Sequence, residues 1–124
     1  VYKRQRPYID NMPTCMAAAD LVICRAGAIT LSEIQAMGKP AILIPSPNVA
    51  ENHQYHNAMA LVNAGAADII EEKDLTGAAL MRKTDKMLLN PEKLEKYSEN
   101  SRKMAITDAN ERIYSVVKKV LGLV

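Results

Sequence analysis

Two short segments of the sequence carry the residue types best suited to binding a polar ligand. The first is the segment 25–33, with the sequence RAGAITLSE. Gly27 permits a tight turn into a predicted helix, and the free amides of Ala28, Ile29 and Thr30 then lie at the positive end of the helix dipole. Because such amides bind anions, this segment is a candidate site for a diphosphate.

The same segment also allows a purely structural interpretation. Thr30 and Glu33 have the spacing of a capping box, in which two side chains satisfy the unpaired amides at the start of a helix. Both interpretations stay open on the residues alone. The segment has neither a complete GxGxxG motif nor a Walker lysine, which argues against a dinucleotide-dependent reductase and a P-loop nucleotidase.

The second segment, residues 45–58, combines prolines with neutral hydrogen-bonding side chains. His53, Gln54 and Asn57 fall within one turn of a predicted helix, so they can face the same small ligand. Neutral donors and acceptors suit sugar hydroxyls. A surface or capping role for the histidine, and a role as general base, also stay open. We expect no metal site, because no histidine and carboxylate pair has ligand spacing, and no cofactor.

Each of these segments follows a short apolar run that predicts a strand. Three such runs, two of them fully apolar, span residues 21–24, 41–44 and 67–70, and each is bounded by glycine, proline or aspartate. Amphipathic stretches between them predict crossover helices over 29–37 and 54–64, ended by Gly38 and Gly65. This alternation predicts an α/β fold with a Rossmann-like parallel sheet, whose function should lie at the carboxyl ends of the strands. Further helices are predicted over 12–19, 75–89, 91–104 and 110–121.

The composition limits the function classes. The chain has 124 residues, 48% apolar and 24% charged, which is typical of a globular domain or of part of a larger protein. No apolar run is long enough for a membrane-spanning helix. The net charge of +2 is spread over interspersed charges, so no nucleic-acid face is expected. Cys15 and Cys24 suit reduced thiols better than a disulfide scaffold.

The first five residues, VYKRQ, resemble the translated end of a sequencing adapter. We therefore expect residues 1–5 to be foreign to the protein and residues 6–124 to form a domain that is incomplete at its N-terminus.

Several motifs together resemble the C-terminal, nucleotide-sugar-binding domain of the MurG-type N-acetylglucosaminyltransferases. These motifs are the segment 25–33, GKPAILIP at 38–45, HQYHNA at 53–58 and AGA at 64–66. The resemblance runs from about Tyr8 to the C-terminus. It implies the C-terminal half of a glycosyltransferase B fold, in which two Rossmann-like domains face each other and this half binds most of the donor, UDP-GlcNAc.

The resemblance also implies roles for individual residues. The main chain of Ile9 would recognise the uracil, with Met12 packing nearby. Glu33 would accept hydrogen bonds from the ribose hydroxyls. The remaining contacts would be Ala28, Ile29 and Thr30 with the diphosphate, His53 and Gln54 with the GlcNAc hydroxyls, and Asn57 as a support for their loop. A capping role for Thr30 is compatible with this site, because a side-chain cap leaves neighbouring amides free.

The implied reaction transfers GlcNAc from UDP-GlcNAc to lipid I, with inversion, and forms the peptidoglycan precursor lipid II. The acceptor site and the catalytic base would belong to an N-terminal domain, so this chain would hold no catalytic residue and would not turn over alone. Its parent would lie peripherally on the cytoplasmic face of the bacterial membrane. Two alternatives stay open: a related glycosyltransferase with another lipid acceptor, and a non-catalytic nucleotide-sugar-binding subunit.

Overall fold

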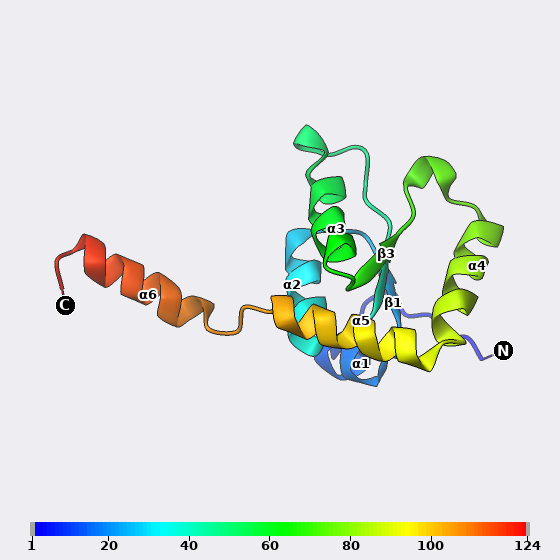
Figure 1. The fold of residues 1–124 in the computed structure, drawn as a ribbon, viewed down its shortest axis with the longest axis horizontal. Coiled ribbons are helices and arrows are strands. Elements are labelled where there is room, and N and C mark those ends of the chain that lie inside the picture. The colour runs from blue at the N-terminus through cyan, green and yellow to red at the C-terminus, as the bar shows by residue number, and fades with distance from the viewer. Residues whose placement is uncertain (1, 124) are drawn as a thin grey trace.

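The computed structural model describes residues 2–123, and its centre is an open parallel sheet (Figure 1). Strands β1 (Val22–Cys24), β2 (Ala41–Leu43) and β3 (Ala67–Ile69) pair in the order β1-β2-β3. Both pairings are parallel, with Ile42 aligned with Ile23 on one side and Asp68 on the other. The predicted Rossmann-like parallel sheet is confirmed, and each strand is slightly shorter than its apolar run.

The helices follow the predicted order along the chain. They are α1 (Met12–Ala18), α2 (Ala28–Met37), α3 (His53–Asn63), α4 (Gly77–Leu88), α5 (Pro91–Met104) and α6 (Ala109–Val120). Short 3-10 helices, η1 (Ala50–Asn52) and η2 (Glu72–Asp74), lie in the loops after β2 and β3. The helix α4 starts later than predicted, because Thr76 caps it by accepting a hydrogen bond from the amide of Ala79 at 3.0 Å.

Helices cover both faces of the sheet. Alternate residues of β2 point to opposite sides, so this strand contributes to a core on each face. On one face, Ala41 and Leu43 belong to a core built with side chains of α1, α2 and α3, namely Met16, Leu31, Ile34, Ala58 and Leu61. On the other face, Ile42 packs with Met87 of α4 and with Leu94 and Tyr97 of α5. The central strand is therefore apolar throughout, as a doubly covered parallel strand requires.

The two predicted stop glycines are confirmed. Gly38 and Gly65 have φ angles of 61° and 69°, in the left-handed region that favours glycine. Helix α5 crosses the end of α2, where Ser98 donates a hydrogen bond to the carbonyl of Gly38 at 2.5 Å and the buried Ser101 donates to that of Ile34 at 3.4 Å. These contacts hold the C-terminal end of α2, whereas its N-terminus follows the carboxyl end of β1.

Helix α6 projects away from the rest of the molecule at the end of a short connection (Figure 1). Its apolar residues are exposed to solvent, with exposed fractions of 63% for Ile113 and 78% for Val120. Within residues 2–123, no helix combines the length and the apolar composition needed to cross a bilayer.

Candidate functional site

The N-terminus of α2 is open and presents unpaired amides. Gly27 is the N-cap residue, and the first amide to bond back into the helix is that of Leu31, which donates to the carbonyl of Gly27 at 3.0 Å. Within the described residues, the amides of Ala28, Ile29 and Thr30 therefore have no backbone acceptor. The side chain of Ile29 is 78% exposed, so no segment among residues 2–123 packs over it.

The capping interpretation of this segment is wrong. Helix α2 begins at Ala28, so Thr30 lies inside its first turn and is not the N-cap residue. No side chain caps the helix. The spacing of Thr30 and Glu33 instead places both on one face of α2, one turn apart.

The reason expected for Gly27 also needs correction. Its φ and ψ of −70° and 144° are open to any residue, so the turn itself does not require glycine. A Cβ atom built at this position would meet nothing within 4 Å. The space at this position is therefore open, and glycine adds no side chain to it next to the unpaired amides, which permits the close approach of a ligand.

A mainly apolar pocket lies between α1 and the second half of α2. Its volume is about 180 Å³, and it is lined by Met12, Pro13, Met16, Glu33, Ala36 and Met37. The structure thus brings together two predicted site residues, Met12 and Glu33. Ile9 lies half-buried in the irregular segment just before α1. The lining is mostly apolar, and Glu33 is its one charged residue within the described part of the chain.

The loop after β2 follows an irregular path, and the side chains of Gln54 and His53 contact its backbone. Glu51 and Asn52 have φ angles of 53° and 52°, in the left-handed region, which is strained for glutamate and better tolerated by asparagine. The amide of Ser46 donates to Oε1 of Gln54 at 2.9 Å. His53 lies with Nδ1 2.9 Å from the carbonyl oxygen of Ala50. When Nδ1 carries the proton, it donates to this carbonyl and leaves Nε2 as an acceptor.

The predicted sugar-binding residues lie on the first turns of α3, next to α2 (Figure 1). His53 is exposed, whereas Gln54 and Asn57 are half-buried. None of the three lines the pocket that holds Met12 and Glu33. They form a second group, whose hydrogen bonds run partly to their own loop.

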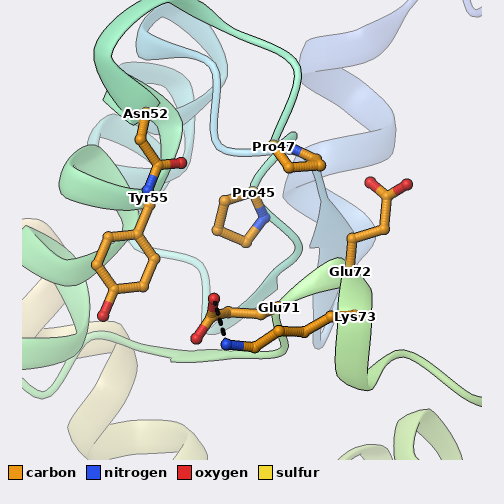
Figure 2. Close-up of a pocket in the computed structure, with 7 residues that line it drawn as sticks. All are labelled: Pro45, Pro47, Asn52, Tyr55, Glu71, Glu72 and Lys73. Carbon is orange, nitrogen blue, oxygen red and sulfur yellow. Dashed lines mark ion pairs between the residues drawn. The ribbon is translucent and has the colours of Figure 1, made fainter.

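A further pocket at the carboxyl edge of the sheet was not foreseen from the sequence (Figure 2). It has a volume of about 240 Å³ and is lined by Pro45, Pro47, Asn52, Tyr55, Glu71, Glu72 and Lys73. Glu71 pairs with Lys73 at 3.4 Å, and the Glu72 carboxylate points away from that pair (Figure 2). Glu72 instead pairs with Arg25 at 2.6 Å. The position of Arg25 directly after a predicted strand was the only sequence signal for this contact.

The two cysteines are free thiols. Cys24 ends β1, and burial raises its pKa to about 11. Its sulfur therefore stays protonated at neutral pH and acts as a small apolar group next to Arg25.

Comparisons with known proteins agree with the sheet and with the motifs. The description "Glycosyltransferase family 28 C-terminal domain" belongs to the family model that matches residues 2–113. A similar protein of Thermoanaerobacter sp. (strain X514) is 52% identical over 114 residues, covering 92% of this chain and 31% of its own length. It is named UDP-N-acetylglucosamine–N-acetylmuramyl-(pentapeptide) pyrophosphoryl-undecaprenol N-acetylglucosamine transferase. A protein of Acetivibrio thermocellus with the same name is 50% identical over 115 residues.

A solved structure is also similar, the crystal structure of MurG from Acinetobacter baumannii. The TM-score is 0.83 at 31% sequence identity, over 92% of this chain and 33% of that one. The expected resemblance to the MurG-type enzymes is therefore confirmed. The chain spans about a third of the length of the curated relatives that it matches.

Proposed function

The chain belongs to the family of glycosyltransferase family 28 C-terminal domains, and on that premise we propose that it binds the sugar nucleotide of an inverting N-acetylglucosaminyltransferase. The donor is UDP-GlcNAc and the acceptor is lipid I, so the product is lipid II. The names of the relatives support both substrates. In this proposal residues 6–124 form the donor-binding domain, and residues 1–5 are not part of it.

The observation that carries the proposal is the open N-terminus of α2, on a helix that also lines an apolar pocket from Glu33 onwards. The amides of Ala28, Ile29 and Thr30 bind the pyrophosphate. One turn along the same helix face, Glu33 accepts hydrogen bonds from the ribose hydroxyls. The uracil then enters the pocket beside Met12 and meets the main chain of Ile9.

The GlcNAc group is bound by the start of α3. Because Oε1 of Gln54 already accepts a hydrogen bond from Ser46, its amide nitrogen is the group left to donate to a sugar hydroxyl. Nε2 of His53 accepts from a neighbouring hydroxyl when Nδ1 donates to Ala50. Asn57, one turn further along α3, supports the loop.

The part of catalysis that falls to this chain is stabilisation of the leaving group. As the bond from the anomeric carbon to the diphosphate breaks, negative charge develops on the UDP oxygens. Preorganised amides and the α2 dipole offset this charge without rearranging. The base that takes the proton of the acceptor hydroxyl lies, in this proposal, on an N-terminal domain. Because the acceptor is lipid-linked, we place the whole enzyme peripherally on the cytoplasmic face of the membrane.

Transfer of radiolabelled GlcNAc to lipid I tests the function. A full-length protein that contains this chain should form lipid II from UDP-GlcNAc, whereas residues 1–124 alone should form none while still binding UDP. Product formation by the 124 residues alone would contradict the proposal that the catalytic base lies on another domain. Absence of both binding and transfer in the full-length protein would contradict the function itself.

A further inference from the structure

One guanidinium group contacts the loops that follow all three strands. Nη1 of Arg25 lies 2.6 Å from Oε2 of Glu72, 3.4 Å from the carbonyl oxygen of Ile44 and 3.5 Å from that of Pro45. Arg25 directly follows β1, Ile44 directly follows β2, and Glu72 begins the short helix η2 after β3. A single side chain therefore connects the loops that follow the three strands.

The topology of the sheet explains how this contact arises. Parallel strands bring their carboxyl ends to one edge, so residues 47 positions apart in the sequence can meet there. Arginine suits this position, because its planar group carries several donors and stays charged. The backbone on either side is held in place, since Ala26 is fully buried and Pro45 is also buried.

We propose that Arg25 is a positioning residue of the donor site. Arg25 holds the loop after β2 in a fixed position relative to the turn at Gly27, which carries the unpaired amides. That loop leads to His53 and Gln54. The sugar-binding side chains and the pyrophosphate-binding amides are thereby kept at the separation that one UDP-GlcNAc molecule requires. This inference rests on the proposed function.

The Glu72 contact distinguishes positioning from direct binding of the pyrophosphate. A guanidinium that binds phosphate gains from being unpaired, whereas this one is paired with a carboxylate at 2.6 Å. Both side chains are about half exposed, at 52% for Arg25 and 43% for Glu72. An exposed pair of this kind adds little to folding stability, so its loss should move the melting temperature by less than about 3 °C.

The decisive variant is Glu72→Gln in a full-length protein that contains this chain, with binding of UDP-GlcNAc and of UDP measured by calorimetry. On charge alone, removing a carboxylate near an anionic ligand tightens binding. If Arg25 positions the loops, the variant binds UDP-GlcNAc about five- to tenfold more weakly. UDP lacks the sugar and does not need both loops, so its affinity changes less than twofold.

Two further variants complete the test. Arg25→Gln should show at least the same loss, because it also removes the contacts with the carbonyls of Ile44 and Pro45. The double variant Arg25→Gln/Glu72→Gln should be no worse than Arg25→Gln, because the contact with Glu72 is already lost. Asp74→Asn, in the same short helix, makes the same charge change away from Arg25 and should bind like the wild type.

Three results would overturn the inference while the wild type still binds UDP-GlcNAc. These are equal or tighter binding by Glu72→Gln, an equal loss for UDP and UDP-GlcNAc, and an equal loss in Asp74→Asn. Failure of the wild type itself to bind UDP-GlcNAc would overturn the proposed function, and this inference with it.

Discussion

Glu33 is the side chain with the most specific expected role in this domain. It lines the pocket that also contains Met12, and it lies one turn beyond the unpaired amides of α2. With the capping box excluded, the structure gives the Glu33 carboxylate no partner among the described residues. A carboxylate in this position is available to a vicinal diol.

Replacing Glu33 by alanine in the full-length enzyme should therefore lower kcat/KM for UDP-GlcNAc by about tenfold or more, which corresponds to about 1.5 to 3 kcal/mol for hydrogen bonds to a charged group. Steady-state kinetics with varied UDP-GlcNAc measures this. Glu95→Ala removes an exposed glutamate from α5 and serves as the matched control. An unchanged kcat/KM in Glu33→Ala would show that this carboxylate does not bind the donor.

The phenol of Tyr97 makes the free energy of unfolding depend on pH. Its hydroxyl donates to Oδ1 of Asp68 at 2.8 Å, and burial, together with the hydrogen bond and charge of Asp68, raises the pKa of Tyr97 to about 12. The folded state thus prefers the protonated phenol. Its contribution to stability is complete below pH 10, the ordinary tyrosine pKa, and is lost as the pH rises towards 12.

Urea unfolding at several pH values between 8 and 11.5, a range chosen to bracket about pH 10, should show this loss. The wild type should lose more free energy of unfolding over the range than Tyr97→Phe, which has no phenol to ionise. Tyr114→Phe should behave like the wild type, because Tyr114 is 65% exposed. Parallel curves for the wild type and Tyr97→Phe would contradict the coupling to Asp68.

Among the elements, α6 differs from the others in its lack of packing. Its apolar side chains are exposed, and an isolated helix of 12 residues is marginal in water. Helix α5, in contrast, crosses α2 and carries Leu94 and Tyr97 into the core. The two C-terminal helices should therefore differ strongly in local stability.

Hydrogen exchange on the 124-residue chain measures that difference. The amides of α6 should exchange at nearly unprotected rates, while those of α5 in the same sample exchange at least about a hundredfold more slowly. Comparable protection in both helices would mean that α6 is packed against a surface in solution.

For the molecule as a whole, the sheet could be predicted from the sequence because its signals are local. The runs at 21–24, 41–44 and 67–70 are each bounded by residues that end strands. Gly38 and Gly65 end helices through their own backbone preference. Such features act over a few residues, so the order of strands and helices followed directly.

The details of the site could not be predicted in the same way. The threonine and glutamate spacing fits a capping box equally well whether or not the helix starts earlier, and here it starts at Ala28. Gln54 braces the amide of Ser46 only because the intervening loop passes through the left-handed residues Glu51 and Asn52. The Arg25 contact with Glu72 depends on the assembled sheet. Each of these features depends on the three-dimensional course of the backbone, which residue spacing does not reveal.

The central claim is that the unpaired amides after Gly27 bind the pyrophosphate of UDP-GlcNAc, and Gly27→Ser tests it most directly. Serine is a favoured N-cap residue, and the backbone at Gly27 suits it without strain. Its hydroxyl would accept a hydrogen bond from an amide of the first turn and fill the space above it. Stability should hold or rise by about 0.5 kcal/mol.

The measurement is calorimetric binding of UDP-GlcNAc to full-length wild type, Gly27→Ser and Gly77→Ser. Gly77 lies at the N-terminus of α4, directly after its N-cap residue Thr76, and also faces open space, so it is a control for the same change at another helix start. We predict that Gly27→Ser binds at least about tenfold more weakly, whereas Gly77→Ser binds like the wild type. Equal affinity in all three proteins, with Gly27→Ser fully folded, would contradict the claim.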